Sequence, residues 1–234
     1  LKSKEICYVG FLRSFLEISI MPRALFLALA LVTGCNLNLI SQEDHKQQIQ
    51  TVLKPVVVIA PVIDSTKEDM NWSLSNEFTY CIKHQLRQKN HLSLIDLDKT
   101  LVLSQNPFGQ DMSWLKKVFS HHEFVVFLEL VEHNEVARQD DKKTIDSKKC
   151  SAELLMTMRV RVFDLRKDEP KVVLQELVHE SHFIPRPFTR SNFQQEKWGH
   201  EMFTISPMGL AHAQFIKHIC NRLEDYVLLA AHND

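Results

Sequence analysis

Histidines are the side chains of this sequence that most readily suggest metal chemistry. Residues 179–182, His-Glu-Ser-His, come close to the H-E-x-x-H zinc motif, which needs two histidines four residues apart on a helix. Here the two histidines are three residues apart in a predicted strand, so we expect them to point to opposite faces. His212 and His218 are six residues apart on a predicted helix and cannot share one ion. The sequence therefore predicts no metal site.

Motifs for other catalytic chemistry are not found either. The five glycines are so far apart that no two could form one phosphate-binding turn, which excludes a P-loop and a dinucleotide-binding fingerprint. No G-x-S-x-G sequence presents a serine nucleophile. Paired carboxylates such as Asp140 and Asp141 lie in a charged connection, and the net charge of −1 gives no electrostatic footprint for nucleic acid. We therefore expect no catalytic residue, no cofactor and no enzymatic activity.

The elements that must position these side chains alternate between strands and helices. Residues 56–60 are a β-branched run typical of a strand buried on both faces, and residues 152–164 alternate between apolar and polar. Apolar residues at four-residue spacing after Asn71 or Ser73 predict a helix that runs to about Lys89. The other expected elements are strands at 91–96, 123–133 and 172–183, helices at 99–104, 114–120 (capped by Ser113) and 208–230, and a long loop at 184–206.

The same patterns predict which side chains share a face. Alternation in 123–133 places Val125, Phe127, Glu129 and Val131 on one side of the sheet. The last helix is expected to bury one stripe of residues: Leu210, Ile216, Ile219, Leu223 and Val227. Glu129 is expected to pair across the sheet with Arg159 or Arg161. The alternative is that these two arginines mark an open sheet face used for binding.

The order β-α-β-α-β-β-β-α predicts a single α/β domain with a mixed sheet of about five strands and packed helices. From residue 55 to residue 230 it is similar to a group of bacterial envelope proteins. The group includes the lipoproteins that activate penicillin-binding proteins, the curli-secretion lipoproteins and the N-terminal domain of the Tol-system propeller protein. This resemblance implies a non-enzymatic domain that docks a periplasmic or cell-wall-synthesis partner. The curli-secretion lipoproteins imply the alternative, a subunit of an oligomeric envelope or secretion assembly.

A targeting signal precedes this domain. Arg23 is followed by nine uncharged residues, 24–32, and then by Thr33, Gly34 and Cys35. A basic start, an apolar run and small residues before a cleavage position form a secretory signal. Nine residues rise only about 14 Å as a helix, too short for a membrane span. Because Cys35 follows directly, the segment resembles the lipobox of bacterial lipoproteins, which implies acyl chains on Cys35.

These signals divide the chain into four parts. We expect residues 1–20 to be an upstream extension, 21–34 a signal peptide, 35–54 a lipidated N-terminus with a polar tether, and 55–234 a periplasmic domain. By the sorting rule of such lipoproteins, Asn36 favours the outer membrane. Cys81, Cys150 and Cys220 remain in the mature chain, an odd number that allows at most one disulfide bond.

The long loop at 184–206 is the main candidate for binding a partner protein. It interleaves basic and aromatic side chains, the types enriched at binding hot spots: Arg186, Arg190, Phe193 and Trp198. In the alternative interpretation the loop's aromatic side chains fold back over the sheet and close the core.

Overall fold

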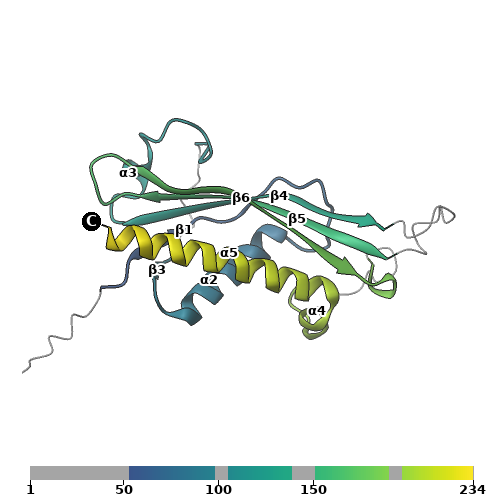
Figure 1. Cartoon of the computed structure of the whole chain (residues 1–234). Helices are drawn as coiled ribbons and strands as arrows, with labels where there is room; N and C mark the ends of the chain where they lie inside the picture. The colour runs from purple at the N-terminus through teal and green to yellow at the C-terminus, as the bar shows by residue number, and fades with distance from the viewer. Residues whose placement is uncertain (1–52, 98–104, 139–150, 190–196, 234) are drawn as a thin grey trace, which may run out of the picture. The chain divides into compact units, whose positions relative to one another are not determined.

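A mixed sheet with the strand order β3-β1-β4-β5-β6 organises the fold (Figure 1). β1 (Val56–Ile59) pairs in parallel with β3 (Ser93–Ile95) and β4 (Phe124–Ala137), and β2 (Ile63–Asp64) pairs with β4 farther along. β4, β5 (Ala152–Asp164) and β6 (Lys171–Ile184) are antiparallel neighbours. The predicted α/β domain with a mixed sheet is therefore confirmed.

The computed structural model describes residues 53–97, 105–138, 151–189 and 197–233. The predicted signal peptide, Cys35 and most of the tether lie outside these residues, as do the predicted helix at 99–104 and the residues Cys150, Arg190 and Phe193. Within the described part of the chain, no helix is both long enough and apolar enough to cross a membrane.

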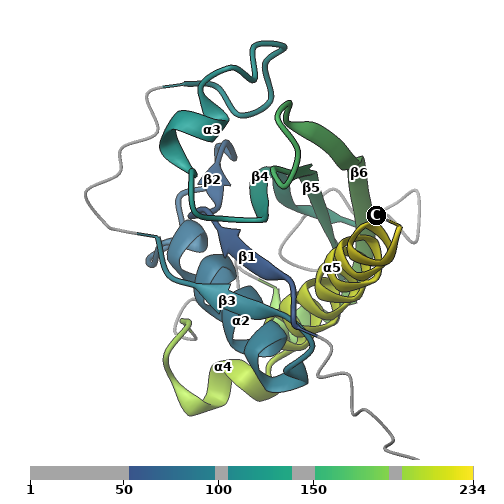
Figure 2. The same ribbon diagram turned by 90° about the vertical axis from the view of Figure 1, so that its left-hand side faces the viewer.

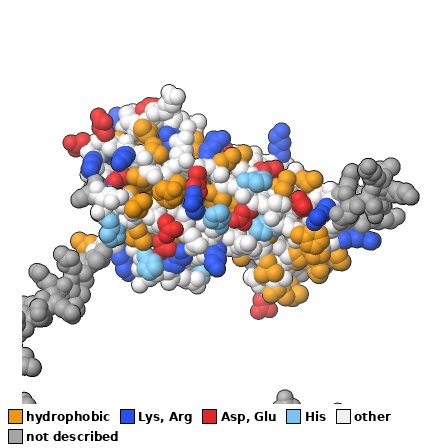
Figure 3. Space-filling model, in the orientation of Figure 1, with side chains coloured by type: hydrophobic (Ala, Val, Ile, Leu, Met, Phe, Trp, Pro, Cys, Tyr) orange, Lys and Arg blue, Asp and Glu red, His pale blue; other side chains and the backbone are white. Residues whose placement is uncertain are grey.

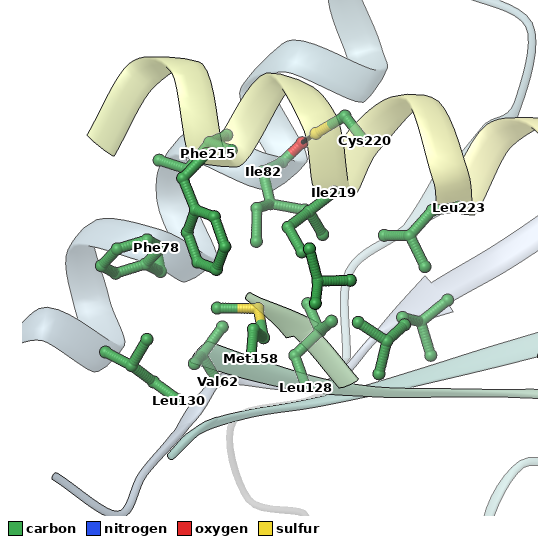
Figure 4. Close-up of a cluster of buried hydrophobic side chains, with 14 of the residues drawn as sticks. Val62, Phe78, Ile82, Leu128, Leu130, Met158, Phe215, Ile219, Cys220 and Leu223 are labelled. Carbon is green, nitrogen blue, oxygen red and sulfur yellow. Dashed lines mark hydrogen bonds between the residues drawn. The ribbon is translucent and has the colours of Figure 1, made fainter. Parts of the chain in front are cut away.

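Two long helices, α2 (Leu74–Lys89) and α5 (Pro207–His232), pack on the same side of the sheet, which we call the helix face (Figures 1 and 2). Figure 4 shows Phe78 and Ile82 of α2 and Ile219 of α5 over Leu128 and Met158 of the strands. The even-numbered apolar residues of β5 all join this core, as the alternation predicts. The core thus forms where one apolar stripe from each helix meets one face of the pleated sheet.

Local signals in the sequence account for the ends of these helices. The Ser73 hydroxyl accepts the backbone N–H of Asn76 at the start of α2, and Asn90 ends the helix in the left-handed conformation at φ 59°. Ser206 caps α5 in the same way by accepting the N–H of Gly209, and Pro207 follows at the first helical position. The predicted helix at 114–120 is shorter, α3 (Leu115–Val118), and its predicted cap is wrong, because the Ser113 side chain makes no capping bond there.

On the opposite side of the sheet, which we call the outer face, the described residues form a covering cluster at one end. Leu115 and Phe119, at the two ends of α3, pack there on Val125 and Phe127 of β4 and on Phe163 of β5. Figure 1 shows the segment around α3 over one end of the sheet, across from the helices. The predicted alternation in β4 is confirmed up to Leu130.

Beyond Leu130 a β-bulge changes the alternation of β4. Leu130 lies opposite Met158, but Glu132 lies opposite Thr157 and His133 opposite Met156, so one extra residue is accommodated at Val131. Because Met156 belongs to the helix face, the bulge turns His133 to that side. Strict alternation from Val125 would have placed it on the outer face.

The predicted long loop at 184–206 and the predicted burial of Leu210 both need correction. A 3-10 turn, η2 (Arg186–Phe188), and a short helix, α4 (Glu201–Ile205), lie within the expected loop. Leu210 is 57% exposed, because the buried side of α5 at this point is formed by Ala211, His212 and Phe215. The other four residues of the predicted stripe are buried.

Candidate functional site

A buried chain of hydrogen bonds joins three elements on the helix face. His133 of β4 and His212 of α5 meet through their Nε2 atoms at 2.8 Å, and His212 Nδ1 lies 2.7 Å from Glu77 Oε1 of α2. Glu77 Oε2 accepts the indole N–H of Trp72 at 2.7 Å. His133, His212 and Glu77 are at most 3% exposed. Buried polar groups are tolerated when they are hydrogen-bonded, and this network, which we call the His–Glu network, meets that requirement.

Aromatic rings enclose the His–Glu network. The Phe203 ring of α4 lies 5.6 Å from the His212 ring and 5.4 Å from the Trp72 ring, centroid to centroid. The Phe78 ring of α2 also lies 5.2 Å from the His212 ring, centroid to centroid. The alternative that aromatic side chains of residues 184–206 close the core therefore holds for Phe203, which is buried.

The protons of the network can be placed with both imidazoles neutral. The Glu77 carboxylate accepts the Nδ1–H of His212, and His212 Nε2 then accepts the Nε2–H of His133. Burial, followed by the nearby His212 ring, lowers the pKa of His133 from 6.5 to about 3. A Glu–His pair of this kind orients the base in hydrolases, but His212 Nε2 faces another imidazole instead of a hydroxyl or thiol nucleophile. The geometry supports a structural link between sheet and helices.

The histidines of the 179–182 motif are on opposite faces of β6, as predicted. His179 Nδ1 lies 2.8 Å from the Thr157 hydroxyl on the outer face, whereas His182 shares the Glu180 carboxylate with His218 of α5 on the helix face. Among the described residues, no group of three or more His, Cys, Asp or Glu side chains is arranged to hold a metal ion.

The S-x-x-K spacing of another group of serine enzymes does occur in the sequence, so an interpretation without it needs correction. Residues 113–116, Ser-Trp-Leu-Lys, match the S-x-x-K pattern of serine acyltransferases. The Ser113 side chain, however, donates to the Asp111 carboxylate, which lowers the pKa of Asp111. With its hydroxyl directed at a carboxylate, Ser113 is not activated by Lys116 in this structure.

The two cysteines in the described part of the chain are free thiols on facing helices. Cys220 is fully buried on α5, and Cys81 is half-buried on α2. Burial raises the pKa of the Cys81 thiol to about 11 and that of Cys220 to about 12. Neither thiol is therefore a reactive nucleophile.

The two arginines predicted to mark an open sheet face have different surroundings. Arg161 is only 8% exposed, because its guanidinium donates to the carbonyl oxygens of Pro107 and Gly109 in the covering segment. An open-face role for Arg161 is therefore wrong. Arg159 pairs with Glu129 at 2.9 Å, so of the two arginines predicted as partners of Glu129, Arg159 is the one that forms the pair. The Arg159 guanidinium also lies over the Phe108 ring.

Beyond Arg159, the outer face is not covered by the segment around α3. Cross-strand pairs fix which side chains lie there: Val136 with Glu153, Glu153 with Phe183, Thr157 with His179, and Arg159 with Leu177. We call this part of the outer face, from residues 132–136 across 153–159 to 177–183, the open face. Leu177 and Phe183 are large hydrophobic side chains that are more than half exposed. At the centre of the open face, the Thr157 hydroxyl donates a hydrogen bond to the Glu132 carboxylate.

Of the described candidates from the predicted binding loop, Trp198 lies against α2, whereas Arg186 lies two residues after the end of β6. Arg186 is exposed at η2. Trp198 is half-buried, and its ring lies 5.9 Å from that of Tyr80 on α2. Hydrophobic side chains also gather over α4 and the start of α5, where Met202, Ile205 and Leu210 are exposed (Figure 3).

An α/β fold with two long helices on one face of the sheet and a partly open face on the other defines the class of this protein. The chain belongs to a protein family of unknown function, DUF7499, whose model matches residues 43–231. No curated protein matches the sequence.

Comparison with solved structures supports this fold class through one of three matches. The hypothetical protein CT253 from Chlamydia trachomatis is 24% identical, with a TM-score of 0.59 over 74% of this chain and 98% of that chain. Lipoprotein GNA1162 from Neisseria meningitidis matches at 7% identity and a TM-score of 0.36, over 71% of this chain and 99% of that chain. The rare lipoprotein B from Shewanella oneidensis matches at 11% identity and a TM-score of 0.38, over 73% of this chain and 98% of that chain. The last two TM-scores are below 0.5, so only the first similarity supports the fold.

Proposed function

We propose that this protein is a lipoprotein, anchored through acyl chains on Cys35, whose α/β domain docks another protein of the cell envelope and performs no catalysis. The anchor rests on the sequence, in which a secretory signal ends directly at Cys35. The outer membrane is the favoured location, because Asn36 follows the cysteine. The docking role rests on one observation, the open face with Leu177 and Phe183 exposed.

The composition of the open face fits a protein partner. An antiparallel sheet with one solvated face normally alternates apolar residues inward and polar residues outward. On β6 this alternation fails at Leu177 and Phe183, which point outward with the polar residues His179 and Ser181 between them. Apolar side chains among hydrogen-bonding groups are the mixture found in transient protein interfaces.

The size of the open face favours a weak contact over a permanent dimer. The open face spans parts of three strands that are about 4.8 Å apart and about seven residues long. Its dimensions are therefore roughly 14 Å by 23 Å. Each side of a standard stable interface buries about 800 Å². A contact of this smaller size becomes effective when both partners are held at one membrane, because tethering raises their effective concentration.

Charges on the edge strand β6 oppose the alternative of assembly through strand pairing. Glu176 and Glu180 point inward along this edge and pair with Arg222 and His218 of α5. Inward-pointing charges are a device that prevents edge-to-edge pairing of sheets. We therefore favour a different protein as the partner over further copies of this chain.

A matched pair of variants tests the docking role on the full-length protein in its membrane. Leu177→Asp changes the open face, and Leu229→Asp changes α5; the two leucines are 60% and 59% exposed. We expect both variants to keep the wild-type thermal midpoint within a few degrees. A photo-crosslinker at residue 183 should label one envelope protein, and Leu177→Asp should lower its stoichiometric co-purification at least tenfold while Leu229→Asp leaves it unchanged.

Two outcomes would overturn the proposal. Retention of the crosslinked protein by Leu177→Asp would remove the open face as its docking surface. Crosslinks that join only copies of this chain would establish the oligomeric assembly instead.

A further inference from the structure

Three large apolar side chains, Met202 and Ile205 of α4 and Leu210 of α5, form an exposed surface that we call the α4 patch (Figure 3). All three are more than half exposed. The first turn of α5 lies directly against α4, since a Cβ on Gly209 would collide with the Phe203 carbonyl. A surface helix normally directs polar side chains to water. The α4 patch is therefore unlike a surface that only faces water.

Amphipathic side chains lie next to α4 in the chain. The Trp198 ring, three residues before α4, lies 5.9 Å from the ring of Tyr80 on α2, which is more than half exposed. Trp and Tyr are enriched where hydrocarbon meets water, because each joins an apolar ring to a polar group. Glu201 is the acidic side chain among residues 197–210, and the exposed Lys197 offsets its charge. This composition is typical of segments that lie in a membrane surface.

The open face has a different composition. Glu132 and His179 are partly exposed there, on the same face as Leu177 and Phe183. A protein interface can supply hydrogen-bond partners to such polar groups, whereas hydrocarbon supplies none. Among the described residues, the α4 patch is therefore better suited to lipid than the open face is.

The tether keeps the whole domain within reach of the membrane, provided by the proposed anchor at Cys35. Cys35 lies 18 residues before Leu53, and a segment of this length spans at most about 60 Å in any conformation. β4, with 14 residues, is about 46 Å long. Every surface of the domain can therefore meet the lipid. Because the domain cannot diffuse away, a weak contact with the lipid becomes effective.

We propose that the α4 patch inserts into the surface of the membrane that holds the acyl anchor, which turns the open face away from that membrane and toward a partner. Phe203 of α4 packs on His212 of α5 on the helix face, whereas Leu177 lies on the outer face. Figure 1 shows α4 on the side of the molecule away from the sheet. This inference rests on the proposed anchor and adds the orientation in which the domain is held.

Photo-crosslinking of the full-length lipidated protein tests the insertion. The protein is reconstituted alone in vesicles of phosphatidylethanolamine and phosphatidylglycerol, with a diazirine amino acid in place of Ile205 or of Leu177, which are 65% and 60% exposed. Mass spectrometry measures the phospholipid adducts. We expect about tenfold more adduct at residue 205 than at residue 177, because only the α4 patch enters the lipid surface.

A second pair of variants tests whether the apolar patch causes the contact. With the crosslinker at residue 205, Met202→Asp should lower the phospholipid adduct several-fold, because a charge in the patch opposes its entry into lipid. Leu229→Asp, which changes an equally exposed leucine near the other end of α5, should leave the adduct unchanged. Both variants should keep the wild-type thermal midpoint within a few degrees.

The results that would overturn the insertion are distinct from those that would overturn the anchor. Protein that floats with the vesicles but gives no more lipid adduct at residue 205 than at residue 177 would keep the anchor and overturn the insertion. Protein that carries no acyl chain and does not float would overturn both. Adducts at residue 205 that join copies of this chain in vesicles, or another protein in the native membrane, would assign the α4 patch to a protein interface instead.

Discussion

His133 and His212 face each other through Nε2 atoms 2.8 Å apart, although strict alternation along β4 would direct His133 to the opposite side of the sheet. The contact exists because the bulge at Val131 adds one residue to β4. It connects the end of the central strand to α5 and, through His212, to Glu77 of α2. A local irregularity in one strand thus provides the polar centre of an otherwise apolar core.

The depressed pKa of His133 predicts a loss of global stability in acid. The unfolded chain binds a proton on this histidine near pH 6.5, whereas the folded protein does so only near pH 3. Between these values the free energy of unfolding should fall by about 1.4 kcal/mol per pH unit as the pH decreases. Urea unfolding at pH 7, 6 and 5 measures this slope. His133→Leu should remove this histidine's contribution, and an undiminished slope in that variant would assign the effect to other groups.

Gly209 should not tolerate a side chain. A Cβ at this position would collide with the backbone carbonyl of Phe203, which lies directly against the first turn of α5. Gly209→Ala is therefore expected to destabilise the protein by about 1–3 kcal/mol, the usual cost of overpacking. Gln214→Ala, at an exposed position of the same helix, serves as control and should change the thermal midpoint little. Equal midpoints for the two variants would refute the close contact between α4 and α5.

Arg161 should hold the segment before α3 against the outer face. Its guanidinium donates to the carbonyl oxygens of Pro107 and Gly109 at 3.1 and 2.6 Å and lies over the Phe163 ring. Arg161→Met should cost about 2 kcal/mol, since hydrogen bonds to charged groups contribute about 1.5–3 kcal/mol. Amide exchange at residues 105–112 should accelerate in Arg161→Met. Arg159→Met, which changes a half-exposed side chain, should alter amide exchange at residues 105–112 little. Faster exchange in Arg159→Met than in Arg161→Met would contradict this assignment.

The sequence predicts those elements whose pattern repeats over many residues. The alternation of β5 places its even-numbered residues on the helix face, and the four-residue spacing after Ser73 defines α2. Both patterns are fixed by the geometry of one regular element and do not depend on its neighbours. The same reasoning predicted the opposite faces of His179 and His182.

The His–Glu network could not be predicted by that reasoning. Its members are far apart in the sequence, and the bulge reverses the face of His133 without an obvious signal such as glycine. The one available hint was Glu77, a charged residue one position before Phe78 on the apolar side of α2. α4 was missed because five residues are too few to show a helical period. Leu210 was assigned to the core by spacing alone, although the tight contact at Gly209 determines how α5 begins.

The lipid anchor on Cys35 is the central claim, and mass spectrometry of the protein purified from its own membrane tests it most directly. The account predicts a mature N-terminal peptide that begins at Cys35 and carries a diacylglyceryl group and an amide-linked acyl chain. Cys35→Ala should abolish palmitate labelling and release the protein from the membrane fraction. An N-terminal peptide that includes residues before Cys35, or labelling that persists in Cys35→Ala, would contradict the account.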